Sequence, residues 1–126
     1  STLTTLPAEG THHSAVGGVP AAGGNTSISH SGTTYPDKAE VVLRCTDADA
    51  GYAVGDEVDI AGAFFTGGGT GIPAFTVHRT TSNVVIVRSS TVTSVYLAPK
   101  GGGAAYATPI TTSKWELKMR CEFWPA

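Results

Sequence analysis

The chain is poor in charge and has no long apolar run. Only 14% of its 126 residues are Asp, Glu, Lys or Arg, which is about half the usual share in a soluble domain. Its formal net charge of −2 gives no basis for attraction to nucleic acid or to an anionic membrane. No stretch approaches the roughly 18 apolar residues that a membrane-spanning helix needs. We therefore expect neither a nucleic acid nor a membrane among its partners.

Cysteine is scarce as well. Cys45 and Cys121 are too few for a disulfide-stabilised scaffold. Each shares the apolar face of its own segment, so both are expected to point inward. One interpretation is a pair of buried, reduced thiols that pack as small apolar groups. The alternative is a disulfide between the first and last strands, which would close a loop of about 75 residues and stabilise the fold by roughly 4 kcal/mol.

The sequence also lacks the motifs that indicate catalysis. No Gly-x-Ser-x-Gly nucleophile elbow is present. The glycine-rich segment 67–71 is not followed by the Gly-Lys-Ser/Thr ending of a phosphate-binding loop. His12 and His13 are adjacent on a segment expected to be extended, so their side chains point in opposite directions and cannot easily share a metal ion. We expect no enzyme, no cofactor and no metal centre at these positions.

The acidic segment 47–59 is the strongest candidate for calcium. It begins like an EF-hand loop, but Tyr52 stands where that loop needs glycine and Val58 where it needs a bidentate glutamate. An EF-hand is therefore excluded. An irregular calcium site stays open, and with it a calcium-stabilised adhesion module; the alternative is a set of solvated carboxylates in turns.

What the sequence does contain is a long, regular alternation near its end. One set of positions is apolar, namely Trp115, Leu117, Met119, Cys121 and Phe123. The positions between them are charged, namely Lys114, Glu116, Lys118, Arg120 and Glu122. A period of two indicates a strand with one buried and one wet face. Trp124 falls on the wet face, and because an exposed tryptophan is typical of an interface, we expect it to contact a partner.

The composition favours strands throughout the second part of the chain. The 16 glycines and seven prolines supply turns, and valine outnumbers leucine. Strands are expected over 39–46, 57–60, 72–79, 83–89, 92–98 and 114–124. We predict an all-β fold, an antiparallel β-sandwich or flattened barrel of about six strands.

Residues 1–36 differ from the rest, because Glu9 is their only charged side chain and Gly and Pro interrupt them repeatedly. We predict an extended anchoring arm over 1–36 and a β-sandwich domain over 37–126. Ordering such an arm costs about 1–2 kcal/mol per residue in backbone entropy, so a neighbouring subunit is expected to hold it. The expected partner contacts in the arm are Leu3, Leu6, His12, His13, Val16 and Val19.

Four features together carry a resemblance to a known group of proteins. They are His30-Ser31-Gly32, the segment Val41-Val42-Leu43-Arg44-Cys45, the segment Gly51-Tyr52-Ala53-Val54-Gly55-Asp56-Glu57-Val58, and Lys114-Trp115-Glu116-Leu117. Over about residues 28–126 the chain resembles small β domains of tailed-bacteriophage virion proteins, found at tail-fibre tips and on head or tail surfaces. Its strand order also resembles the trimeric six-stranded sandwich of H-type lectins.

The resemblance implies a non-enzymatic structural protein of the virion, assembled in the bacterial host cytoplasm. Its arm would anchor it to capsid, neck or tail partners, and its β-sandwich head would project outward as a decoration or fibre protein. A homo-oligomer is expected, with a trimer favoured. The alternative is a lectin-like module that attaches the virion to host surface glycans. In that case Tyr52, Phe64 and Phe65 are the expected glycan contacts.

Overall fold

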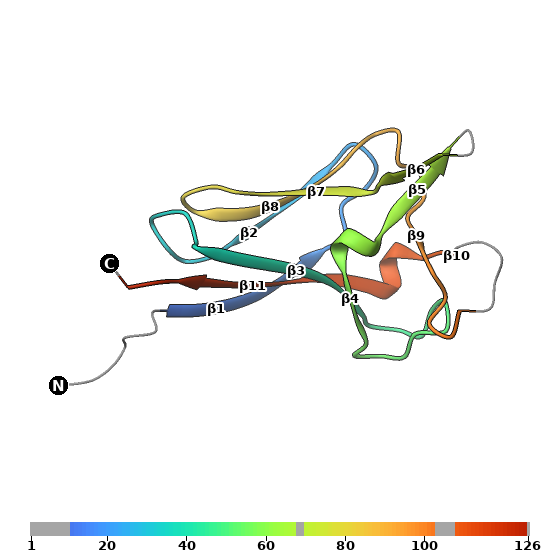
Figure 1. Ribbon diagram of the computed structural model, residues 1–126, viewed down its shortest axis with the longest axis horizontal. Coiled ribbons are helices and arrows are strands. Elements are labelled where there is room, and N and C mark those ends of the chain that lie inside the picture. Colours follow the sequence, from blue (N-terminus) through green and yellow to red (C-terminus); the bar gives the residue numbers. More distant parts are fainter. Residues whose placement is uncertain (1–10, 68–69, 103–107, 126) are drawn as a thin grey trace.

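The structure, a computed structural model, describes residues 11–67, 70–102 and 108–125 (Figure 1). Its strands are β1 (Thr11–Gly18), β2 (Asn25–Ser29), β3 (Lys38–Cys45), β4 (Glu57–Asp59), β5 (Phe64–Gly67), β6 (Thr70–Pro73), β7 (Phe75–Arg79), β8 (Asn83–Arg88), β9 (Tyr96–Leu97), β10 (Thr108–Pro109) and β11 (Trp115–Phe123). Two short 3-10 turns, η2 (Ile60–Gly62) and η3 (Thr112–Lys114), precede β5 and β11. The predicted all-β class is confirmed, with more strands than the six expected. Within the described residues, no helix is long and apolar enough to cross a membrane.

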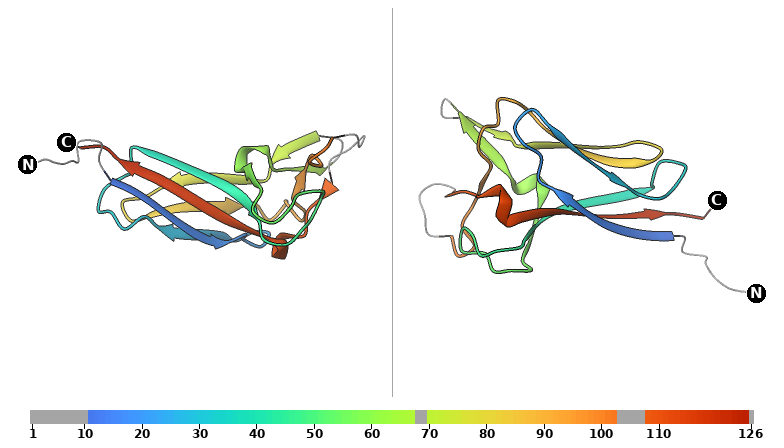
Figure 2. Two further views of the ribbon diagram at one scale, coloured as in Figure 1. Left: turned by 90° about the horizontal axis from the view of Figure 1, so that it is seen from below. Right: turned by 180° about the vertical axis from the view of Figure 1, so that it is seen from behind.

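The strands form three antiparallel sheets, in the orders β1-β11-β3-β4, β2-β8-β7 and β10-β9-β5-β6. We call the first the four-stranded main sheet, the second the three-stranded sheet and the third the end sheet. The main sheet and the three-stranded sheet face each other as the two layers of a sandwich, and the end sheet lies at one end of it (Figures 1 and 2). The predicted sandwich is therefore confirmed.

Strand β11 is the centre of the main sheet. It pairs with β1 on one side and with β3 on the other. Its alternation holds as predicted: Trp115, Leu117, Met119 and Cys121 are buried, and the charged residues between them lie on the outer face. The hairpin expected around residues 80–82 is present as β7 and β8.

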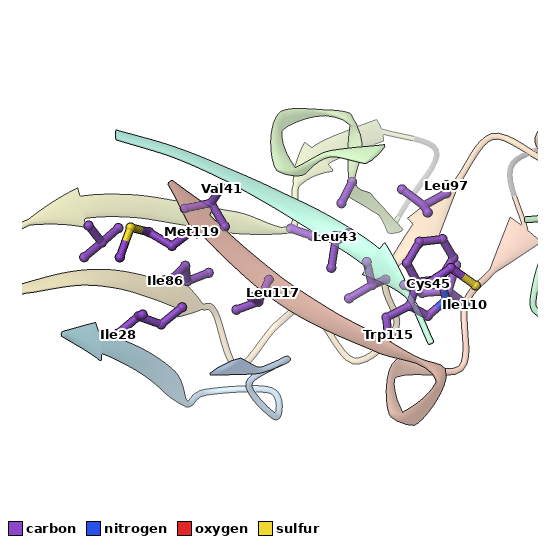
Figure 3. Packing of buried hydrophobic residues seen from close by; sticks show 14 of the residues in the cluster. Ile28, Val41, Leu43, Cys45, Ile86, Leu97, Ile110, Trp115, Leu117 and Met119 are labelled. Atoms are coloured by element: carbon purple, nitrogen blue, oxygen red, sulfur yellow. The ribbon is translucent and has the colours of Figure 1, made fainter. Parts of the chain in front are cut away.

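The core lies between the two layers (Figure 3). Leu43 of β3, Ile86 of β8 and Leu117 of β11 are completely buried there. Each such side chain contributes about 1.5–3 kcal/mol on leaving water. Ile28 of β2 packs in the same cluster, so a residue of the expected arm is part of the core.

The structure corrects the expected arm and its boundary. Strand β1 pairs with β11 over its whole length, from Thr11 opposite Phe123 to Gly18 opposite Glu116, and β2 pairs with β8. Residues from 11 onward therefore belong to the sandwich, while residues 1–10, with Leu3 and Leu6, lie outside the described residues. The alternation of β1 gives no clear apolar pattern in the sequence because its inward positions include Ala15 and Gly17. Space explains the glycine, because a Cβ at Gly17 would lie 2.8 Å from Cγ2 of Thr26 on β2.

The disulfide alternative is also wrong. Both cysteines are free and buried, as the thiol interpretation predicts. Cys45 lies opposite Trp115, whereas Cys121 lies opposite Ala39. Six residues along a strand span about 20 Å, and a disulfide needs Cα atoms within roughly 7 Å. The two similar local sequences indicated the face of each cysteine, but antiparallel pairing sets them at opposite ends of that face.

Candidate interaction surfaces

Three carboxylates of segment 47–59, those of Asp49, Asp56 and Glu57, accept hydrogen bonds from different partners. Oδ2 of Asp49 accepts hydrogen bonds from the Thr111 backbone N–H (2.8 Å) and from Nε1 of Trp115 (2.9 Å). Oδ2 of Asp56 accepts from Nζ of Lys100 at 2.7 Å and from the Ala53 backbone N–H at 2.9 Å. The hydrogen bond from Lys100 is the largest cause of a lowered pKa of the Asp56 carboxyl, and the bond from Ala53 adds to it.

The acidic side chains of this segment are not gathered into one cluster. Within the described part of the chain, no group of three or more His, Cys, Asp or Glu side chains is placed so that it could hold a metal ion. Glu57 is engaged by Arg120 at 2.7 Å, and this hydrogen bond lowers the pKa of Glu57.

The segment 51–58 that carries the resemblance folds into tight turns attached to the core. Gly51 and Gly55 adopt positive φ angles of 82° and 94°, which favour glycine. Tyr52 packs edge-on against Trp115, with ring centroids 5.5 Å apart, and its hydroxyl donates to the Ala98 carbonyl at 2.8 Å. Tyr52 thus connects the turns to the start of β11.

The other two expected glycan contacts lie in the end sheet. Phe64 stacks on Tyr96 with ring centroids 6.1 Å apart, and Phe65 is tilted against the same ring at 6.4 Å. The structure therefore brings Phe64 and Phe65 together around Tyr96 and places Tyr52 elsewhere, against Trp115. All three expected contacts are half-buried.

The outer face of the main sheet is densely charged. Roughly half of the charged side chains of the whole chain lie there, namely Lys38, Glu40, Arg44, Glu57, Asp59, Glu116, Lys118, Arg120 and Glu122. Arg120 reaches both Glu57 (2.7 Å) and Glu40 (3.5 Å), so its ion pairs connect three strands. This network raises the pKa of Arg120, with the Glu57 hydrogen bond as the largest cause. Because positive and negative side chains are intermixed on this face, their electrostatic potentials largely cancel.

The outer face of the three-stranded sheet is the opposite in character. Register places on it Asn25, Ser27, Ser29, Thr76, His78, Asn83, Val85 and Val87. Within these three fully described strands, that face carries no Lys, Arg, Asp or Glu. We call it the uncharged face. The two outer surfaces of the sandwich thus differ sharply, and a surface without charge is typical of the central part of an interface.

Two exposed aromatic residues lie at the end of the sandwich where β1 begins and β11 ends (Figure 1). Trp124 is 60% exposed, as its position on the wet face predicts, and Tyr35 is also 60% exposed. Asp37, two residues after Tyr35 in the chain, is bonded to the end of β11: its Oδ2 accepts from the Trp124 backbone N–H at 2.7 Å, and its own N–H donates to the Glu122 carbonyl at 2.9 Å. Sequence reasoning missed Tyr35, although a tyrosine between polar residues and a proline is a recognisable loop aromatic.

A hollow of about 290 Å³ lies at the same end, lined by His13, His30, Ser31, Gly32, Thr33, Thr34 and Phe123. His30 is buried and fully engaged: its Nε2 donates to the Thr80 carbonyl at 2.9 Å and its Nδ1 accepts from the Gly32 N–H at 3.1 Å. His13 also lines a wider groove of about 370 Å³ on the charged side.

The remaining expected partner contacts are dispersed along β1 and beyond it. His12 is exposed and lies 4.0 Å from Glu122, and Val16 is 54% exposed on the outer side of β1. Val19 is half-buried and packs against the core. Of the four expected arm contacts that the structure describes, His12 and Val16 are thus the exposed ones.

Comparison with known proteins adds no assignment to these surfaces: no family, no curated protein and no solved structure matches the chain.

Proposed function

We propose that the chain is a non-enzymatic structural protein of a phage virion, a decoration or fibre protein that docks through its surfaces. The proposal rests on the resemblance carried by residues 28–126 and on one structural observation. That observation is the uncharged face, which is set against a charged face on the other side of the same sandwich. A free domain needs charge on its surface for solubility, so a Ser/Thr/Asn/Val face suits contact with capsid, neck or tail partners.

The structure changes how the docking element is to be tested. Residues 11–36 contribute two strands to the fold, so they cannot serve as a detachable arm. We assign docking to the uncharged face, with the segment 1–10 as a second candidate that can be removed separately. Both assignments concern the same proposed role and can be compared in one incorporation assay.

The decisive experiment is incorporation into particles. Purified virions from the phage that encodes the chain should contain it at a defined copy number by quantitative mass spectrometry. The variant Ser27→Glu/Thr76→Glu should fold and be lost from the particles, because it buries new carboxylates in the interface. The control Thr93→Glu places one carboxylate on an exposed loop residue outside the three-stranded sheet and should be incorporated normally. Absence of the wild-type chain from virions would refute the virion role.

A glycan-binding module is the second candidate, and the exposed pair Tyr35 and Trp124 favours it. Aromatic faces beside neutral hydroxyl groups suit the apolar faces and hydroxyl groups of a sugar, and Ser31, Thr33 and Thr34 line the adjacent hollow. Titration with bacterial surface polysaccharides should then show binding that Tyr35→Ala and Trp124→Ala each weaken. The variant His78→Ala, at an exposed ring on β7, is the control. No binding to any host polysaccharide would exclude this candidate.

A further inference from the structure

The outer edge of β1 is open. Strand β1 is an edge strand of the main sheet and pairs with β11 on one side only. On its other side, within the described residues, the one hydrogen bond to its backbone is from the Thr26 hydroxyl to the Gly18 carbonyl, at 2.6 Å. Beside that bond, Gly17 passes close to β2. From Thr11 to Val16, the backbone groups of this edge are therefore available for pairing, as the position of β1 at the border of the sheet shows (Figure 2).

The other edges of the main and end sheets carry features that discourage pairing. Strand β4 has three residues, two of which are the carboxylates Glu57 and Asp59. Strand β6 ends in Pro73, and β10 has two residues including Pro109. Short length, charge and proline are the usual protections of a sheet edge. Strand β1 has none of them: it is eight residues long and its sequence, Thr-His-His-Ser-Ala-Val-Gly-Gly, contains neither charge nor proline.

We infer that β1 is the pairing edge for a second copy of this chain. The two β1 strands would run antiparallel about a two-fold axis and join two main sheets into one continuous sheet. In such a two-fold pair, residues of β1 in one molecule lie opposite residues of β1 in the other. Because β1 carries no Lys, Arg, Asp or Glu, no like charges meet across the axis. Val16, now 54% exposed, would face a residue of the other copy.

The charges of the main sheet are compatible with this arrangement. The nearest charged row lies on β11, one strand in from the edge. In the pair of molecules, the two β11 strands would be three strand spacings apart, or roughly 14 Å. That separation exceeds the Debye length of about 8 Å at physiological salt. Repulsion between the two charged rows is therefore screened.

The opposite edge of the main sheet, strand β4, explains why pairing stops at two molecules. Pairing of β1 with β4 of another molecule would repeat without closing and would build a filament. The shortness and two carboxylates of β4 oppose that. Pairing of β1 with β1 uses the only unprotected edge of the main sheet and closes at two molecules. This inference does not depend on the virion role, and it departs from the trimer that the resemblance implies.

The test is the solution mass of the purified full chain. Analytical ultracentrifugation from low to high micromolar concentration should show a monomer–dimer equilibrium. The variant Ser14→Lys/Val16→Lys places positive charges on the outer side of β1, where both native residues are exposed, and should lose the dimer. The control Ser27→Lys/Thr76→Lys adds the same charge to the uncharged face and should keep it. Circular dichroism verifies that both variants are folded.

Hydrogen exchange of the wild-type chain gives an independent readout. Backbone amides of β1 between residues 11 and 16 should exchange more slowly as the concentration rises, whereas amides of β7 should not change. A monomer at every concentration, a trimer, or a dimer that the β1 lysines leave intact would each overturn the inference. Exchange in β1 that is independent of concentration would overturn it as well.

Discussion

His30 illustrates how one buried polar residue organises a loop. Its ring connects the β7–β8 turn to the loop after β2, through the Thr80 carbonyl at 2.9 Å and the Gly32 N–H at 3.1 Å. A carbonyl only accepts and an N–H only donates, so the proton of the neutral ring lies on Nε2. The ring also packs against Phe123 of β11, with centroids 5.1 Å apart. Strands of both layers thus meet at this residue.

Replacement of His30 should therefore be costly. His30→Ala leaves a cavity and two unpaired backbone groups, and should lower the free energy of unfolding by about 2–5 kcal/mol. His30→Phe, which retains a ring and loses both hydrogen bonds, should also destabilise. Urea denaturation measures both effects. The exposed His78 is the matched control, and His78→Ala should change stability by less than about 0.5 kcal/mol. Equal stability of the two alanine variants would contradict the structural role of His30.

We expect the folded protein to lose stability in acid because of Asp56 and Glu57. Hydrogen bonds with Lys100 and Arg120 lower the pKa of these carboxyls in the folded state. The unfolded state then binds more protons in that range, so this contribution to stability is present above the unfolded pKa of about 4 and is lost as the pH falls through the lower folded pKa. Comparing urea denaturation near pH 7 and near pH 3 should show the loss. Lys100→Met should make it smaller, and Lys38→Met, at an exposed lysine, should not.

At the scale of elements, the sequence was informative where a strand uses large apolar residues on one face. Strand β11 was predicted almost to its ends because Trp115, Leu117 and Met119 alternate with charges. Strands β1 and β2 were not predicted, because the inward positions of β1 include the small, half-buried Ala15 and Gly17, and β2 buries a single large residue, Ile28. Sequence periodicity reveals a strand when large apolar residues on its inner face alternate with polar residues on its outer face. Where β1 and β2 pack closely, the inner position must be small, as Gly17 is, and the alternation is lost.

Truncation tests this interpretation of β1 and β2. Removal of residues 1–10 should leave a folded protein with nearly unchanged stability, because the described sandwich begins at Thr11. Removal of residues 1–30 deletes the neighbours of β11 and β8 and should give an unfolded or aggregated product. Circular dichroism and thermal denaturation distinguish the two. A stable, cooperatively folding chain without residues 1–30 would contradict the assignment of β1 and β2 to the fold.

The register of β3 and β11 makes a prediction about the thiols. Because Cys45 and Cys121 lie at opposite ends of the shared face, an oxidant should not join them within one molecule, and mass spectrometry should show no loss of two hydrogens.

Burial raises the pKa of the Cys121 thiol. Its contribution to stability is therefore full below the unfolded pKa of about 8.5 and is lost as the pH rises toward the folded value. Alkylation should be slow in the native protein and fast in urea.

The whole molecule shows what composition conceals. A charged fraction of 14% gives no indication that roughly half of those charges lie on one outer face and none on the other. Only strand register reveals that distribution. At the end with Tyr35 and Trp124, alternation predicts the exposure of Trp124, but not its hydrogen bond to Asp37, which lies in a loop far away in sequence.

The pairing of β1 with β11 also decides how the sandwich would respond to a pulling force. Thr11 and Phe123 lie opposite each other, and the chain continues from both at the same end of the molecule. A load applied through these two ends would act across the strands, along the hydrogen bonds between them. The bonds would then break one after another, as a zipper opens, instead of resisting together in shear. A protein held by both ends would yield at β1 under a modest force.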